Sequence, residues 1–214
     1  MDRMNDAGVT WRYYQARGGH GQWNAPDAIK SIRYGPSYRN VVWPSHKFLA
    51  DVARGHLAHV TYVTPSADDS DHPAHNDGTG PAWVASVVNA VGESPFWDTS
   101  AIFIVWDDWG GWYDHVKPTI YNSFELGFRV PLIVVSPYAK SGYISHEQHE
   151  FGSILKFVEE VFRVKSLGTT DVRSDDLSDC FDFSQPPRKF KRIPGALDAR
   201  YLANHMEPSE EPGD

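Results

Sequence analysis

The chain has 214 residues, of which 41% are hydrophobic and 22% charged, and this predicts one substantial domain with a packed core. Its net charge of −8 argues against a nucleic-acid partner, and its single cysteine excludes an internal disulfide and a cysteine-rich metal site. No apolar run reaches the roughly 18 residues that a membrane-spanning helix needs. The opening MDRMNDAGVTWRYYQ lacks the apolar centre of a signal peptide, which leaves the compartment open.

The predicted elements alternate between strands and helices. In VTWRYYQ, Val9, Trp11 and Tyr13 alternate with Thr10, Arg12 and Tyr14, which predicts a half-buried strand. The later predicted strands are continuously apolar, as is typical of strands covered on both faces, so we expect an α/β fold with α/β/α layers and a mostly parallel sheet. These strands are predicted at 57–64, 100–106 and 130–135, and helices at 46–54, 81–92 and 147–163.

Polar residues that could bind a metal follow three of these strands. Asp71, His72 and His75 follow the first, and Asp107 and Asp108 follow the second. His146 and His149 follow the third. If the strands are parallel, all three groups meet at the carboxyl edge of the sheet, where α/β proteins bind ligands. Carboxylates and imidazoles together suit a divalent cation such as Mg, Ca, Mn, Zn or Fe.

The stretch AIFIVWDDWGGWYDHV places two acids side by side at the end of an apolar strand. Asp107 and Asp108 repel each other unless a cation or a proton lies between them, which favours a metal site. The alternative is a simple turn before Gly110 and Gly111, just as the Asp71 segment could be a polar loop. In the metal interpretation the glycines let the backbone approach a bound group, and Asp114 with His115 orients a ligand.

Four segments together resemble a known family: WDDWGGWYDHV, DHPAHNDG, LGFRVPLIVVSPYAK and HEFGSILKFVEE. They resemble the phosphoesterase family of bacterial and plant phospholipases C and acid phosphatases, in the alkaline phosphatase superfamily, from about residue 5 to about residue 190. The resemblance implies an alkaline-phosphatase-like fold and hydrolysis of a phosphoric ester, with phospholipids among the candidate substrates. It also implies a Ser or Thr nucleophile and one divalent metal ion, held partly by Asp107 and Asp108.

The resemblance also suggests roles for the histidines. It implies catalytic roles for Asp71, His72 and His115, and it makes His75, His146 and His149 candidates for a second metal or for phosphate contacts. Asp108 departs from the family pattern, because many members carry Glu there, and this leaves the identity of the metal open.

Two parts of the family pattern have no counterpart here. The family begins with a strand that ends in a Glu-Asn-x-Ser-Phe-Asp motif, which supplies further metal ligands, and the nucleophile lies downstream of it. We therefore expect residues 1–190 to be the C-terminal portion of a catalytic domain without its first strand or strands, and residues 191–214 to be a polar tail. The nucleophile stays unidentified, and an upstream half of the domain is the expected partner. The alternative function is a non-catalytic, truncated remnant that binds a cation weakly.

Overall fold

A computed structural model describes residues 1–18, 21, 23–73, 75 and 78–197. The chain forms two compact units. Unit 1 contains residues 1–97, 162–165 and the segment from 190 onwards, and unit 2 contains residues 98–161 and 166–189.

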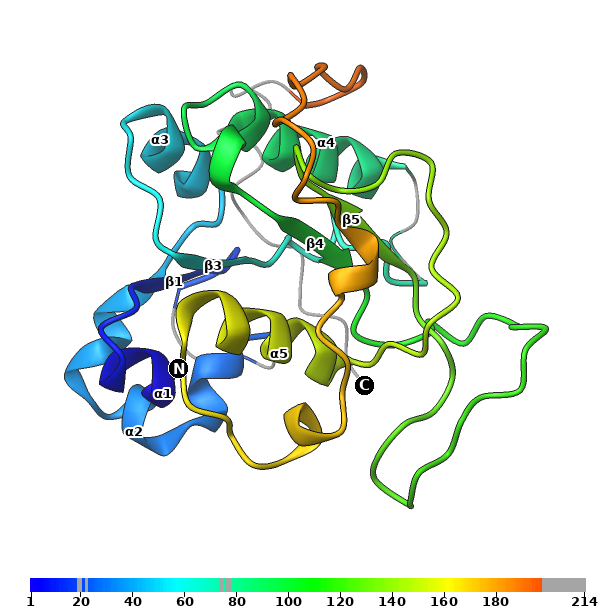
Figure 1. Cartoon of the computed structure of the whole chain (residues 1–214). Helices are drawn as coiled ribbons and strands as arrows, with labels where there is room; N and C mark the ends of the chain where they lie inside the picture. Colours follow the sequence, from blue (N-terminus) through cyan, green and yellow to red (C-terminus); the bar gives the residue numbers. More distant parts are fainter. Residues whose placement is uncertain (19–20, 22, 74, 76–77, 198–214) are drawn as a thin grey trace. The chain divides into compact units, whose positions relative to one another are not determined.

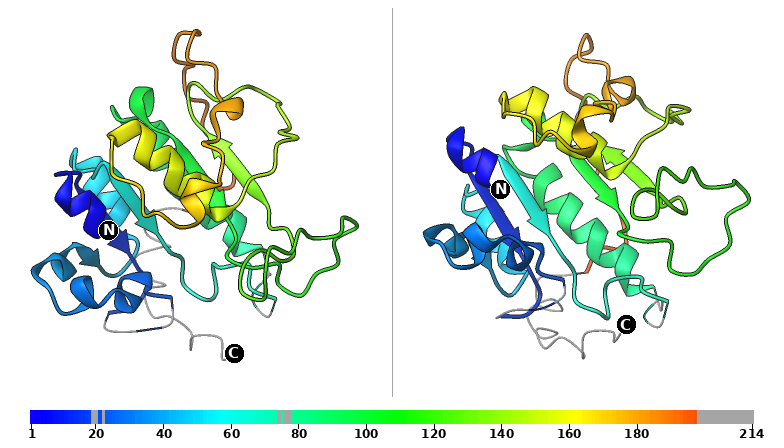
Figure 2. Two further views of the ribbon diagram at one scale, coloured as in Figure 1. Left: turned by 60° about the horizontal axis from the view of Figure 1, so that its bottom comes forward. Right: turned by 90° about the horizontal axis from the view of Figure 1, so that it is seen from below.

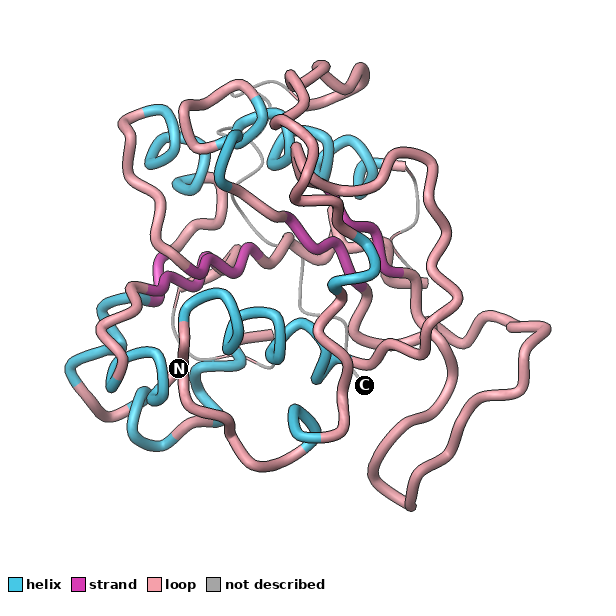
Figure 3. The backbone as a smooth tube through the Cα atoms, in the orientation of Figure 1, coloured by secondary structure: helices cyan, strands magenta, loops and turns pink. Residues whose placement is uncertain are grey.

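Helices and strands are short and are joined by long loops (Figure 3). None of the helices in the described part of the chain is long and apolar enough to cross a membrane. The α-helices are α1 (Asp2–Asp6), α2 (Lys30–Arg33), α3 (Lys47–Ala53), α4 (Thr79–Gly92) and α5 (Phe151–Phe162). The strands are β1 (Trp11–Tyr14), β2 (Val41–Val42), β3 (Val60–Val63), β4 (Ile102–Val105) and β5 (Leu132–Val135). Single 3₁₀ turns occur at Ala25–Ala28, Pro36–Asn40, Trp97–Thr99, Thr170–Val172 and Ser178–Cys180.

Unit 1 contains a parallel three-stranded sheet in the order β2-β1-β3, of which β1 and β3 are labelled in Figure 1. Trp11 of β1 pairs with Val60 of β3, and Tyr13 pairs with Val41 of β2. Parallel neighbours need crossover connections, and the helices of the intervening segments provide them. The predicted α/β fold is therefore confirmed.

Both faces of β1 are covered, although its sequence predicts a half-buried strand. Trp11, Tyr13 and Tyr14 are all buried. Helix α3 covers the Tyr14 face, because the Phe48 ring packs edge-on against the Tyr14 ring and Asp51 accepts a hydrogen bond of 2.7 Å from the Tyr14 hydroxyl. Burial, together with this bond to Asp51, raises the pKa of Tyr14 to about 12. The polar tip of Tyr14 thus allows a residue of the predicted outer face to be buried.

The segment after residue 189 returns to helix α4 in unit 1. The Phe190 ring lies edge-on to the Trp97 ring at 4.9 Å and against Gly92, the last residue of α4. The Asn89 side chain bonds both the amide and the carbonyl of Ile193, each at 2.9 Å. This segment therefore contributes to the packing around α4. The remainder of the predicted tail, residues 198–214, lies outside the described residues.

Unit 2 contains a two-stranded antiparallel sheet of β4 and β5. Ile102 pairs with Val135, and Val105 pairs with Leu132. The prediction that strands 100–106 and 130–135 run parallel in one sheet with strand 57–64 is wrong. The connection between β4 and β5 contains no helix, so it cannot form the crossover that parallel strands need. An apolar strand sequence does not itself encode direction.

One face of the β4–β5 pair carries the core of unit 2. Phe103, Leu132 and Val134 on this face pack against buried Leu177 and Phe181. Ile154 and Phe157 of α5 join the same cluster, and Figure 2 shows α5 lying along the strand pair. The core therefore ties α5 and the 177–181 segment to the sheet and fixes the position of the residues beside them.

Candidate functional site

Asp107 and Asp108 lie on the exposed loop that follows β4. Asp108 Oδ1 accepts a hydrogen bond of 2.6 Å from the Gly110 amide, so it closes a tight turn. Gly110 and Gly111 have φ angles of 64° and 75°, which are in the left-handed region that favours glycine. The turn interpretation therefore accounts for Asp108 and the two glycines in this structure. Both Asp107 and Asp108 remain exposed.

The carboxylate pair fits a hard cation by its chemistry but supplies only part of a ligand set. Ca²⁺ takes about six to eight oxygen ligands and Mg²⁺ takes six. Among the described residues, the one group of three His, Cys, Asp or Glu side chains with ligand atoms within 4.8 Å of one another is His149, Asp179 and Cys180. A cation at Asp107 and Asp108 would therefore need water, substrate or other chain segments to complete its coordination.

Asp114 binds Arg129, and its predicted role in orienting a ligand stays a prediction. The Asp114 oxygens accept hydrogen bonds of 2.7 Å from Nε and Nη2 of Arg129. These bonds, with a third from the Val116 amide, hold the pKa of Asp114 well below its usual range. His115 Nδ1 lies 3.7 Å from Asp114, and its side chain is 82% exposed. The His115 imidazole is therefore exposed, and Asp114 closes the loop through its ion pair with Arg129.

Asp71, His72 and His75 belong to unit 1, on the loop between β3 and α4. Asp71 has a φ of 61°, and a Cβ at Gly80 would come within 2.3 Å of Asp71 Oδ1. The Asp71 carboxylate thus lies at the N-terminus of α4, where the helix dipole favours negative charge. The His72 and His75 rings are 6.3 Å apart, and His75 Nδ1 lies 3.2 Å from Asp68.

Because β4 and β5 are antiparallel, the residues that follow them leave this sheet at opposite ends. Asp107 and Asp108 follow the end of β4 that pairs with the start of β5. His146 and His149 come after the other end of β5. The expectation that both groups emerge at one edge of a parallel sheet is therefore wrong. His146 is exposed, whereas His149 is partly buried.

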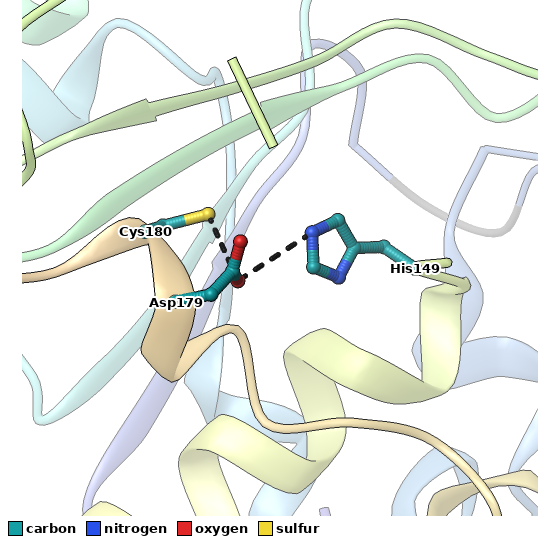
Figure 4. Close-up of side chains that lie close together, drawn as sticks. All are labelled: His149, Asp179 and Cys180. Atoms are coloured by element: carbon teal, nitrogen blue, oxygen red, sulfur yellow. Dashed lines mark hydrogen bonds and ion pairs between the residues drawn. The ribbon is translucent and has the colours of Figure 1, made fainter. Parts of the chain in front are cut away.

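His149 is the centre of a polar cluster in unit 2 (Figure 4). Its Nδ1 lies 2.8 Å from Asp175 Oδ2, and its Nε2 lies 2.8 Å from Ser145 Oγ and 3.7 Å from Asp179 Oδ1. Ser145 Oγ also lies 2.6 Å from Asp179 Oδ2. Asp175 and Asp179 therefore flank the imidazole, one on each ring nitrogen.

Cys180 completes the cluster from the other side of Asp179. Its Sγ lies 3.5 Å from Asp179 Oδ1, and the residue is buried. Burial, followed by the nearby Asp179 carboxylate, raises the pKa of Cys180 to about 11. The pKa of Asp179 is lowered: burial alone would raise it, but hydrogen bonds from Ser145 and Tyr143 outweigh that effect. At neutral pH the cluster without an ion thus holds a thiol beside a carboxylate.

The sequence interpretation found His149 but not its partners. The sequence beyond residue 165 is polar and rich in turn-forming residues, so it predicts no site. The single cysteine, Cys180, served only to exclude an internal disulfide and a cysteine-rich metal site. A usable signal was present in SDDLSDC, because Asp175 and Asp179 are four residues apart and are followed directly by a cysteine. Buried Leu177 between them anchors the segment in the core.

The Phosphoesterase family profile matches residues 1–165, which is most of the chain. The chain belongs to the Phosphoesterase family. This match confirms the resemblance that the Asp107–Asp108 segment and its companions indicated.

Several curated proteins are similar to the chain. Phospholipase C B of Mycobacterium tuberculosis is 27% identical over 235 residues, covering 89% of this chain and 44% of the relative. A non-hemolytic phospholipase C of Burkholderia pseudomallei is 26% identical over 90% of the chain, and non-specific phospholipase C6 of Arabidopsis thaliana is 30% identical over 56% of it. The chain spans less than half the length of these relatives.

Proposed function

We propose that this chain provides part of the catalytic site of a phosphoric ester hydrolase of the phospholipase C or acid phosphatase type. The observation that carries the proposal is the adjacent, exposed carboxylate pair Asp107–Asp108, placed directly after β4 within the region that the family profile matches. Relatives named phospholipase C support a phosphoric ester as substrate and make a phospholipid a candidate.

Asp107 and Asp108 are the residues that would hold one divalent ion, with Ca, Mn, Mg, Zn and Fe as candidates. Such an ion, when bound, polarises phosphoryl oxygens and lowers the pKa of a nucleophile. The exposed His115 imidazole on the same loop is the candidate to carry a proton for the leaving group. The family resemblance makes Asp71 and His72 further catalytic candidates.

We further propose that residues 1–190 correspond to part of a catalytic domain and do not contain its nucleophile. No Ser or Thr in the sequence matches the family's nucleophile. Ser66 and Ser70 lie on the loop after β3, but Ser66 donates its hydrogen bond to Asp69 and Ser70 donates to the Ala67 carbonyl. Since removing a nucleophile commonly costs several orders of magnitude in rate, we expect slow hydrolysis by this chain alone.

A second candidate function is a non-catalytic remnant that binds a cation weakly. The hydrogen bond from Gly110 to Asp108 favours it, because it gives Asp108 a role that needs no metal. The two candidates differ in whether any hydrolysis depends on the carboxylate pair.

The test is hydrolysis of p-nitrophenyl phosphate and p-nitrophenyl phosphorylcholine by the chain, with each candidate ion added in turn. We expect turnover far below ~1 per second, an ordinary enzyme rate. The residual rate should fall further in Asp107→Asn/Asp108→Asn and stay unchanged in the matched control His56→Gln, whose imidazole is exposed in unit 1.

Each result has a definite consequence. A metal-dependent rate that needs Asp107 and Asp108 supports the hydrolase site. A complete lack of hydrolysis, with weak cation binding that the double substitution abolishes, supports the remnant. Turnover near ~1 per second would show that the chain is a complete catalyst and would overturn the missing-nucleophile proposal. Cation binding unchanged by the double substitution would remove the metal role of the pair.

A further inference from the structure

The cluster of His149, Asp179 and Cys180 lies in unit 2 and takes no part in the hydrolysis proposed above. The strand pairing separates it from Asp107 and Asp108, because a bridge between Ala139 and Phe181 attaches the Asp179 segment to the residues that follow β5. Asp107 and Asp108 instead follow the opposite end of this strand pair. The cluster therefore needs its own explanation.

The His149 ring is held in the orientation that presents Nε2 as a ligand atom. Asp175 accepts from the ring Nδ1 at 2.8 Å, and it also accepts hydrogen bonds from Ser153 Oγ and from the Leu177 amide. A carboxylate that already accepts from Ser153 and Leu177 is placed to accept from an Nδ1–H as well, and this tautomer leaves Nε2 as the ligand atom. A carboxylate behind the imidazole is the arrangement that fixes metal-binding histidines in proteins.

Donor atoms of three kinds lie together in the cluster. His149 Nε2 faces Ser145 Oγ at 2.8 Å, and Asp179 Oδ2 accepts hydrogen bonds from Ser145 at 2.6 Å and from Tyr143 at 3.1 Å. Asp179 Oδ1 faces Cys180 Sγ at 3.5 Å. An imidazole nitrogen, a carboxylate oxygen and a sulfur are thus close enough together for one transition-metal ion to contact all three.

The spacing of the three donors suits a small tetrahedral ion. Neighbouring ligand atoms around tetrahedral zinc are about 3.5 Å apart, given Zn–N and Zn–O bonds of about 2.0 Å and Zn–S bonds of about 2.3 Å. Here Asp179 Oδ1 lies 3.5 Å from Cys180 Sγ and 3.7 Å from His149 Nε2. All three donor atoms are within 4.8 Å of one another. Figure 4 shows the imidazole and the sulfur directed toward the Asp179 carboxylate.

We propose that His149, Asp179 and Cys180 bind one divalent transition-metal ion of the zinc class, with water or Ser145 as the fourth ligand. Imidazole, carboxylate and thiolate together select such ions over Ca²⁺ and Mg²⁺, which prefer oxygen ligands alone. The side chains of His149 and Asp179 are 15% and 22% exposed, so the ion reaches the cluster from solvent. The ion replaces the thiol proton of Cys180, because a coordinating thiol is deprotonated.

The test uses the full chain and Co²⁺ as a spectroscopic substitute for Zn²⁺. We expect uptake of one Co²⁺ with a thiolate-to-metal charge-transfer band, displaced by Zn²⁺ and retained in excess Mg²⁺. Since Cys180 is the only cysteine, the band reports this site alone. It should disappear in Cys180→Ser, and Asp175→Asn should weaken Co²⁺ affinity about 10- to 100-fold.

Two controls separate this site from the family carboxylates. Asp107→Asn/Asp108→Asn and His146→Gln should keep the band and the affinity, because these residues lie outside the cluster. X-ray absorption of the unsubstituted chain with Zn²⁺ should show one sulfur at about 2.3 Å. This measurement holds even if Cys180→Ser does not fold. Lack of Zn²⁺ uptake, an absorption spectrum without sulfur, or a Co²⁺ spectrum unchanged in a folded Cys180→Ser chain would each overturn the proposal.

Discussion

Asp114 and Arg129 form a two-bond ion pair that joins the two arms of the loop between β4 and β5. Both hydrogen bonds are 2.7 Å long, and they link residues fifteen apart in sequence. The same loop carries Asp107 and Asp108 at its start. The ion pair therefore limits how far the carboxylate pair can move.

Arg129→Lys should loosen this loop without unfolding unit 2. Lysine keeps the charge but cannot form two parallel bonds to one carboxylate, so the loop should be cleaved faster in limited proteolysis. His115→Gln is the matched control, because His115 lies beside Asp114 but is 82% exposed. Equal cleavage rates in Arg129→Lys and the unsubstituted chain would show that the ion pair does not restrain the loop.

Gly111→Ala should destabilise the turn after Asp108 by about 1 kcal/mol, because an alanine is strained at a φ of 75°. A Cβ at Gly111 meets no atom within 4 Å, so backbone strain is the single cost. Gly127→Ala is the control in the same loop, since it also meets nothing within 4 Å and has no positive φ. Urea denaturation should separate the two variants, and equal midpoints would contradict the assigned backbone strain.

Glu159→Gln should stabilise the protein, increasingly so as the pH rises. Glu159 is buried, its Oε2 has no hydrogen-bond partner, and burial followed by the charge of Asp171 raises its pKa. A raised pKa means that the folded state binds the proton more tightly than the unfolded chain. This contribution is complete below the ordinary pKa of 4.5 and is lost as the pH rises through the folded value.

Glutamine does not ionise, so the variant avoids this loss. The gap in unfolding free energy between Glu159→Gln and the unsubstituted chain should be small at pH 4 and should reach about 1 kcal/mol at pH 8, the scale of one buried unpaired polar group. Glu160→Gln, at the neighbouring and exposed carboxylate that pairs with Lys156, is the control. A gap that does not change with pH would show that Glu159 keeps one protonation state throughout.

Gly92→Ala should destabilise unit 1, because its Cβ would lie 2.3 Å from the Phe190 ring. The ring is also packed on Trp97, so it cannot move away freely, and we expect a cost of about 2 kcal/mol. Phe190→Ala removes the clash together with its own contacts. The double substitution should therefore cost less than the sum of the two single ones, and simple additivity would show that they do not interact.

The elements were largely predictable from local sequence, whereas their directions were not. The apolar run before Asp107 predicts β4, and the periodic run after His149 predicts α5, which starts four residues later than expected. The antiparallel pairing of β4 and β5 depends on a long connection without a helix, and nothing in the strand residues reveals it. The parallel sheet of unit 1 confirms the predicted α/β class. Of the three strands that were expected to carry ligands to one edge, however, this sheet contains only β3.

Candidate ligands can be named from sequence where they adjoin a strand, as at Asp107 and Asp108, and the role of this pair stays a prediction. The His149 cluster could not be named in this way, because Asp175, Asp179 and Cys180 are brought to the histidine by the packing of Leu177 and Phe181 on the sheet. Tertiary packing brings these residues together, and the local sequence pattern does not predict that packing.

The path of the chain through the two units has a consequence for the order of folding during synthesis. Unit 1 is made from early and late segments, because Phe190 and Ile193 return to α4 after all of unit 2 has been made. A nascent chain that ends before residue 190 leaves Gly92 and Asn89 without these contacts. Unit 1 therefore completes its packing only after its last segment has left the ribosome, and until then α4 is the part of unit 1 most exposed to a chaperone or a protease.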